Sequence, residues 1–209
     1  MKFTVITPTI RPQYLQMTKD TLAQQTVQDF EHIIMVGDPA NGFTLPKDYN
    51  TALRKAQGEI IVSLQDCIEI PPTALERIGQ LDHTRTAYTY PVVKQGKKPD
   101  WRIFKGDGDE IDSQHWEIDF ASAPKSLFFD VGGFDEVYCD GWSCDNVELA
   151  IRASFAGYMF RVKHPPAGSA LDHDEILEHP FRNTLKQNSW RLHTTMADAR
   201  SGEWKKSYL

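Results

Sequence analysis

The first 64 residues alternate short apolar segments with amphipathic ones, and this alternation restricts the fold more than any other feature. Strands are predicted at residues 2–7, 32–36 and 59–64, which are short runs rich in β-branched residues. Helices are predicted between them at residues 14–26 and 46–56. Strands joined by helices of this length pair in parallel through right-handed crossovers. The pattern predicts an α/β fold with a mixed, mostly parallel central sheet flanked by helices, whose ligands bind at the carboxyl ends of the strands.

The second half of the chain is less regular. A long polar stretch at residues 94–114 is rich in glycine and charged residues, and we expect it to be a lid or binding loop. Trp101 and Arg102 in this stretch are candidates to close over a bound phosphate. Around it we predict strands at residues 86–93, 116–122 and 158–162, and helices at residues 73–81, 124–130 and 145–156.

Length and composition limit the class of protein. A chain of 209 residues fits one domain with a sizeable core, and a net charge of -6 argues against a nucleic acid as the main partner. Three cysteines without a C-x-x-C pair suit a reducing compartment. The sequence shows no secretory leader and no apolar run long enough to span a membrane. We therefore expect a cytoplasmic protein.

Three motifs follow one another along the first 160 residues. They are Val5-Ile6-Thr7-Pro8-Thr9 with Arg11-Pro12, then the segment from Asn50 through Gly58-Glu59-Ile60-Ile61-Val62-Ser63-Leu64-Gln65-Asp66, and then Gly132-Gly133-Phe134-Asp135-Glu136 followed by Gly141-Trp142 and Asp145-Asn146-Val147-Glu148-Leu149 with Arg152. In this order they resemble the family 2 glycosyltransferases, which have the nucleotide-binding fold called GT-A. The resemblance implies transfer of a hexosyl group from a nucleotide-diphosphate sugar, with a UDP-sugar expected, to a saccharide or other hydroxyl acceptor. It also implies a Mn²⁺ or Mg²⁺ cofactor.

Two positions depart from the pattern of that family. Gln65-Asp66-Cys67 keeps one aspartate where the family has two or more, and Asp145-Asn146 stands where a Glu-Asp pair is common. The retaining polypeptide N-acetylgalactosaminyltransferases have a Glu-Asn pair there. A non-catalytic relative that binds glycans or partners is therefore an alternative. A sugar nucleotidyltransferase is a further one, although residues 7–12 lack the glycine of a phosphate loop.

Asp66 and His173 are the predicted metal ligands. Asp66 follows a buried strand, and carboxylate oxygens are ligands that Mg²⁺ and Mn²⁺ prefer. His173 matches a downstream histidine of the family, with Asp172 or Asp174 to orient its ring. The alternatives are a turn aspartate that caps the loop before Pro71 and a solvated loop histidine.

The resemblance assigns the nucleotide site to the loops after the first strands. The alternative for these residues is ordinary turn chemistry around the prolines of the same loops. The predicted nucleotide-binding set is Thr7, Pro8, Thr9, Arg11, Asp38, Asn50 and Asp66, with Asp38 as the acid that contacts uracil.

Asp145 is the predicted catalytic residue, as a general base on the acceptor hydroxyl. Trp142, just before it, is the predicted platform for an acceptor sugar, since pyranose faces pack on indole. The alternative for Asp145 is an N-cap with Glu148 three residues on, which is a capping box without chemistry. The alternative for Trp142 is a core position.

We divide the chain into a GT-A domain at residues 1–180 and a tail at residues 181–209. The domain has a nucleotide-binding half at about 1–93 and an acceptor half at about 115–180. The tail carries six Lys or Arg against two acidic residues, together with aromatic side chains. Such a segment suits peripheral contact with an anionic membrane surface or a lipid-linked acceptor. We prefer the other interpretation, a helix packed on the domain or a dimer contact, and the oligomeric state is not predicted.

Overall fold

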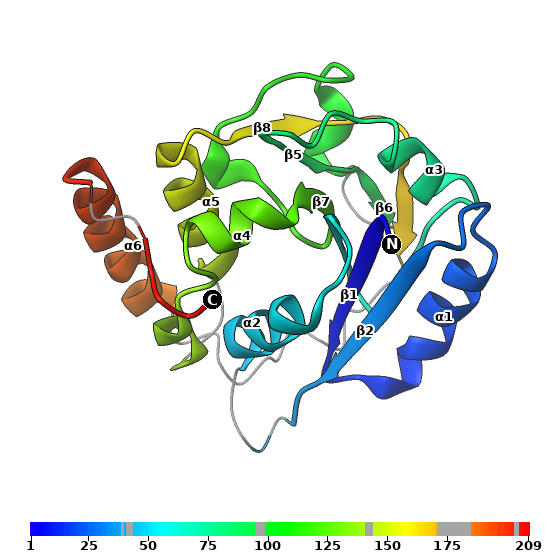
Figure 1. The fold of residues 1–209 in the computed structure, drawn as a ribbon, viewed down its shortest axis with the longest axis horizontal. Coiled ribbons are helices and arrows are strands. Elements are labelled where there is room, and N and C mark those ends of the chain that lie inside the picture. The colour runs from blue at the N-terminus through cyan, green and yellow to red at the C-terminus, as the bar shows by residue number, and fades with distance from the viewer. Residues whose placement is uncertain (39, 41–43, 95–98, 141–143, 171–184, 203–204) are drawn as a thin grey trace.

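A six-stranded sheet runs through the centre of the protein in the order β2-β1-β3-β7-β5-β8 (Figure 1). The computed structural model describes residues 1–38, 40, 44–94, 99–140, 144–170, 185–202 and 205–209. In this sheet, β7 pairs antiparallel with both of its neighbours, and the other pairs are parallel. The predicted mixed, mostly parallel α/β sheet is confirmed. Its strands are β1 (Phe3–Thr9), β2 (Phe30–Val36), β3 (Ile60–Leu64), β5 (Thr86–Thr89), β7 (Phe120–Pro124) and β8 (Met159–Val162).

Helices cover both faces of the sheet (Figure 1). On one face lie α1 (Leu15–Ala23) and α3 (Ala74–Ile78), and on the other lie α2 (Leu45–Lys55), α4 (Lys125–Asp130) and α5 (Asp145–Phe155). The outermost helix, α6 (Leu185–Arg200), packs against α5. No helix within the described residues is long and apolar enough to cross a membrane.

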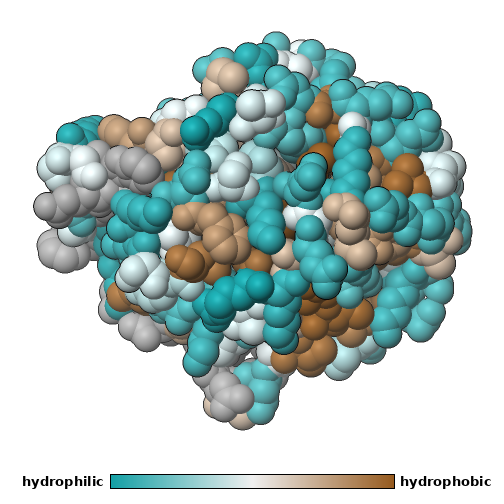
Figure 2. All heavy atoms as spheres, in the orientation of Figure 1, coloured by the Kyte–Doolittle hydropathy of each residue, from teal (hydrophilic) through white to brown (hydrophobic). Residues whose placement is uncertain are grey.

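The two faces of β1 show how the strand sequence builds two cores. Successive side chains of a strand point to opposite faces, so Phe3 and Val5 pack with Leu22 of α1 while Ile6 packs with Leu53 of α2. All these side chains are buried. By contrast, β2 is an edge strand whose side chains are mostly half-buried, and a hydrophobic area lies over it on the otherwise mainly hydrophilic face in Figure 2.

Pro91 divides the predicted strand at residues 86–93 into two. A proline has no N–H for a strand ladder, and here β5 ends at Thr89 while β6 (Val92–Lys94) joins a second, three-stranded sheet. In that sheet β9 (Gly168–Ala170) lies between β6 and β4 (Ile68–Glu69). The prediction of a single strand was therefore wrong.

Two other predicted boundaries also shift. The strand predicted at residues 116–122 begins only at Phe120, because Trp116 is buried beside the sheet with its indole N–H donated to the Tyr88 carbonyl. The polar stretch at residues 94–114 contains a short 3-10 turn at Trp101–Phe104, and a second one follows at Ser113–His115.

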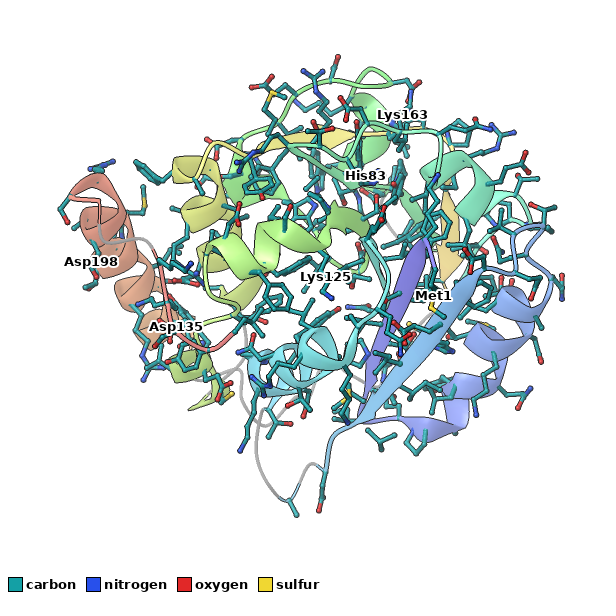
Figure 3. The ribbon with its side chains drawn as sticks, in the orientation of Figure 1. Met1, His83, Lys125, Asp135, Lys163 and Asp198 are labelled. Atoms are coloured by element: carbon teal, nitrogen blue, oxygen red, sulfur yellow. The ribbon has the colours of Figure 1, made fainter. Side chains whose placement is uncertain are left out.

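The end of the chain returns to the turn at Gly132 and Gly133. The Lys206 N–H donates to the Val131 carbonyl at 2.9 Å, and the Tyr208 N–H donates to the Gly132 carbonyl at 3.0 Å. Lys206 also forms an ion pair with Asp135 at 3.1 Å. Figure 3 shows Asp135 beside α6 and the C-terminal segment. This geometry matches the expectation of a tail packed on the domain.

Candidate functional site

The candidate site lies where β1, β2 and β3 end. Leu64 at the end of β3 pairs with Phe120 at the start of antiparallel β7, so Asp119 lies at the same edge. The Gln65 N–H donates to the Asp119 carbonyl at 2.9 Å. This topology brings together the loops after β1 and β3 and the segment before β7, as expected for an α/β sheet.

Asp66 is buried at this edge, and protein groups hold both of its carboxylate oxygens. The Thr9 hydroxyl donates to Oδ2 at 2.5 Å, and the Arg11 guanidinium donates to Oδ1 at 2.6 Å. The Thr9 hydroxyl in turn accepts the Arg11 backbone N–H at 2.7 Å. Three of the predicted nucleotide-site residues therefore form one hydrogen-bonded cluster.

The Arg11 side chain is held in place, but one of its two terminal nitrogens has no hydrogen-bond partner among the described residues. Its guanidinium lies over the Tyr14 ring, 5.3 Å from the ring centre. Its Nη1 atom is buried and has no hydrogen-bond partner among the described residues. A buried donor without a partner is unfavourable. A ligand that accepts a hydrogen bond from Nη1 would remove this cost.

The described residues do not fit the predicted metal. A divalent cation at Asp66 would compete with Thr9 and Arg11 for the carboxylate oxygens and would lie beside a guanidinium of like charge. Within the described part of the chain, no group of three His, Cys, Asp or Glu side chains stands ready to hold a metal ion. The other predicted ligand, His173, lies outside the described residues.

Thr7 and Asn50 are buried and bonded to protein groups. The Thr7 hydroxyl pairs with His32 Nε2 at 2.9 Å, and burial lowers the pKa of His32 to about 4. The Asn50 amide donates to the Phe134 carbonyl and accepts the Phe134 N–H. These contacts give both side chains a structural role, and their predicted contact with a nucleotide stays a prediction.

Asp38 and Pro8 remain near the surface at the strand ends. Pro8 is half-buried in β1, and Asp38 is exposed with its Oδ1 accepting the Ala40 N–H at 2.9 Å. Asp38 lines an open hollow of about 440 Å³ beyond the end of β2. The residues that line it are Val36, Gly37, Asp38, Thr44, Lys47 and Asp48.

Asp145 begins α5 at the same edge. Because β8 is parallel to β5, the helix that leads into β8 starts at the edge where β1 and β3 end. Burial raises the pKa of the nearby Tyr49 hydroxyl, and the charges of Asp145 and Asp119 act in the same direction. The Asn146 amide donates to the Trp116 carbonyl at 2.8 Å and fixes the first turn of the helix.

The Asp145 carboxyl group is buried and only partly satisfied. Burial raises its pKa to about 6, while its own backbone N–H and that of Asn146 act in the opposite direction. Its Oδ2 has no hydrogen-bond partner among the described residues. The N-cap of α5 is Cys144 with a φ of 73°, so Asp145 is the first helical residue and not the predicted cap. Glu148 pairs instead with Arg152, with both side chains fully buried.

Sequence reasoning missed Asp119 and misplaced Arg102. The Arg102 guanidinium donates to Asp119 through both terminal nitrogens, at 2.7 and 2.9 Å, and also to Asp100. Only 3% of its side chain is exposed, so it anchors the segment and does not close over a phosphate. No motif signals Asp119, which only the antiparallel β3–β7 register brings to the edge. Trp142 lies outside the described residues.

No protein-family model and no curated protein matches this chain. Among solved structures, the chain resembles S. aureus TarS 1-349 in complex with UDP-GlcNAc, with 18% identity and a TM-score of 0.67 over 83% of this chain. It resembles the same protein with UDP at 16% identity and a TM-score of 0.68 over 99% of this chain. It also resembles GalNAc-T7 with UDP, GalNAc and Mn²⁺, with 12% identity and a TM-score of 0.62 over 83% of this chain.

The chain is shorter than these structures. It covers 59% of the TarS chain with UDP-GlcNAc, 68% of the TarS chain with UDP and 44% of the GalNAc-T7 chain. At these identities the comparison establishes the fold, and it agrees with the mixed sheet and its flanking helices. The chain has the α/β fold of the GT-A glycosyltransferases.

Proposed function

We propose that this chain is a family 2 glycosyltransferase that moves a hexosyl group from a UDP-sugar to a saccharide or other hydroxyl acceptor. One observation carries the proposal: a buried carboxylate, Asp145, has a free oxygen at the edge where Thr9, Arg11 and Asp66 form a polar cluster. An oxygen that can accept a proton then lies at the same edge as groups that can bind a phosphate. A solved structure with the same fold holds UDP-GlcNAc, which supports our proposal of a nucleotide site at this edge.

The proposed reaction uses groups of the chain itself. The acceptor oxygen forms a bond to the anomeric carbon of the sugar while the bond between that carbon and the β-phosphate oxygen of UDP breaks. The hydroxyl proton passes to the Asp145 carboxylate, and the electron pair of the broken bond leaves with UDP. A carboxyl group whose pKa burial raises to about 6 is a stronger base than an exposed one and is still ionised at neutral pH.

The proposed donor site is made of Pro8, Thr9, Arg11 and Asp38. Asp38 lines the hollow beyond β2, which is of a size to take a base and ribose. A solved structure with this fold holds UDP and another holds UDP-GlcNAc, which favours the same nucleotide here. Trp142 stays the proposed acceptor platform, three residues before Asp145 in sequence. The GT-A domain at residues 1–180 and the tail at 181–209 stay our proposed division.

A panel of nucleotide sugars tests this function. Each donor is incubated with the full chain, and released nucleotide is measured with and without simple saccharide acceptors. We expect slow hydrolysis of one UDP-sugar, faster release with the right acceptor, and loss of both in Asp145→Asn. Asp29→Asn is the matched control, since this exposed side chain lies at the opposite end of the sheet, before β2. Failure to turn over any donor would reject the transferase.

A non-catalytic nucleotide or glycan binder is the second candidate. The Thr9–Asp66–Arg11 cluster favours it, because both Asp66 oxygens already accept a hydrogen bond from the protein. Such a protein would bind UDP and would hydrolyse no donor. Its Asp145→Asn variant would bind UDP as tightly as the parent chain.

A further inference from the structure

The negative charge of Asp66 in the proposed donor site is neutralised by an arginine of the same chain. Asp66 carries one negative charge, and Arg11 supplies one positive charge at 2.6 Å. The carboxylate is almost fully buried, whereas a fifth of the Arg11 side chain is exposed. The arginine therefore lies on the solvent side of the pair, where an incoming diphosphate would meet it first.

Arg11 has the properties of an anion-binding group. Its Nη1 is buried and has no partner within the described residues, while Nη2 is held by Asp66. The ring of Tyr14 and the Thr9–Asp66 contact fix the plane of the guanidinium. A fixed guanidinium with a free N–H matches the geometry of phosphate oxygens and binds them through charge-assisted hydrogen bonds.

From this geometry we infer that Arg11 is the cation that neutralises the donor diphosphate, that Asp66 positions Arg11 and does not hold a metal, and that UDP binding is independent of divalent metal. The inference rests on the proposed function and deepens it. Asp66 thereby has the opposite effect from a metal ligand. A metal ligand raises UDP affinity through the ion that it holds, whereas Asp66 lowers the charge that Arg11 presents to UDP.

The experiment titrates UDP calorimetrically into the full chain, once with EDTA and once with Mn²⁺. We expect the two affinities to agree within about threefold. Asp66→Asn should bind UDP as tightly as the parent chain or up to about tenfold more tightly, because the arginine loses its counter-charge. UDP affinity that rises more than about tenfold with Mn²⁺, and is abolished in Asp66→Asn, would overturn the inference and leave the proposed function intact.

Arg11→Met and a uridine titration separate phosphate recognition from misfolding. This variant should bind UDP at least about tenfold more weakly, with no recovery in Mn²⁺, while its affinity for uridine stays unchanged. Arg85→Met, at an exposed arginine whose ion-pair partner is Asp130 on α4, is the control and should bind UDP like the parent chain. Unchanged UDP affinity in Arg11→Met would overturn the inference. Binding of UDP in neither buffer would reject the inference and the proposed function together.

Discussion

The side-chain amide of Asn50 pairs with both backbone groups of Phe134, donating to its carbonyl at 2.9 Å and accepting its N–H at 2.8 Å. The side chain thus forms the two hydrogen bonds that a neighbouring backbone would form in a β-sheet, with a residue 84 positions away in sequence. It also donates to Glu136 at 3.0 Å. Through Asn50, helix α2 holds the turn that carries the Gly132-Gly133-Phe134-Asp135-Glu136 motif.

Asn50→Asp tests this structural role against the nucleotide contact expected from sequence. The substitution keeps the shape but removes the donor and places a charge beside Glu136, so we expect a loss of about 2 to 4 kcal/mol in unfolding free energy. Urea unfolding measures the loss. UDP affinity of the folded variant should not change, and a weakened affinity without a loss of stability would favour the nucleotide role instead.

The first half of the fold could be predicted because its signals are local. The strands and helices up to Leu64 each show their own period, and β1 needs only its alternation to define both cores. The second half depends on contacts that no local pattern encodes. Asp119 reaches the site only through the antiparallel β7 register, and Arg102 looks like a surface cation until Asp100 and Asp119 are seen around it.

The candidate site was predicted in part for the same reason. Thr9, Arg11 and Asp66 follow adjacent strands, so their meeting at one edge follows from topology. Sequence gave no sign that Arg11 would occupy the carboxylate of Asp66, because the pairing depends on side-chain direction. Likewise, the cap that we considered as the alternative role of Asp145 lies one residue earlier, at Cys144, in a left-handed conformation that few non-glycine residues adopt.

Asp145→Asn should abolish turnover and stabilise the protein. Burial raises the Asp145 pKa from 3.8 to about 6 in the folded chain, so the folded state prefers the protonated acid. The stability that this preference provides is complete below pH 3.8 and is lost as the pH rises through about 6. At pH 8 the variant should therefore exceed the parent by about 2 to 3 kcal/mol, and at pH 4 the two should be nearly equal.

Urea unfolding at pH 4 and pH 8, together with a pH–rate profile, checks this prediction. The rate of the parent chain should rise with pH and level off above the Asp145 pKa of about 6. Three other titratable groups interact electrostatically with Asp145, namely Glu148, Tyr49 and Cys139. Burial raises the pKa of each of them. An equal stability difference at both pH values would show that the charge of Asp145 is not the cause.

Arg102→Met should be among the most destabilising single changes in the chain. It leaves the half-buried carboxylates of Asp100 and Asp119 without their buried cation, a loss of about 3 to 5 kcal/mol. Although burial alone would raise the Asp100 pKa, hydrogen bonds from Arg102 and the Val92 N–H bring it below 3.8. The stability from this acid is present above pH 3.8 and is lost as the pH falls further, so the loss in Arg102→Met should shrink in acid.

Denaturant unfolding at pH 7 and pH 3.5 measures the Arg102 effect, with Arg161→Met as control. Arg161 is partly exposed in a long ion pair with Glu110, so its removal should change stability by less than about 1 kcal/mol. A similar small effect in Arg102→Met would mean that the ion pairs of Arg102 with Asp100 and Asp119 contribute little to stability.

Gly132→Ala should detach the C-terminal segment from the domain. An added Cβ would lie 1.7 Å from the Lys206 carbonyl oxygen, and the φ of 77° is itself unfavourable for alanine. Gly157→Ala is a matched control, since its φ is 86° but nothing lies within 4 Å of the added atom. In both variants an alanine must adopt a left-handed conformation, which costs about 1 kcal/mol. Only Gly132→Ala also loses the hydrogen bonds from the backbone N–H groups of Lys206 and Tyr208 to the carbonyls of residues 131 and 132. We therefore expect Gly132→Ala to unfold at lower urea than Gly157→Ala, with faster proteolysis after Lys205 or Lys206. Equal midpoints and equal cleavage would show that the segment contributes nothing to the turn.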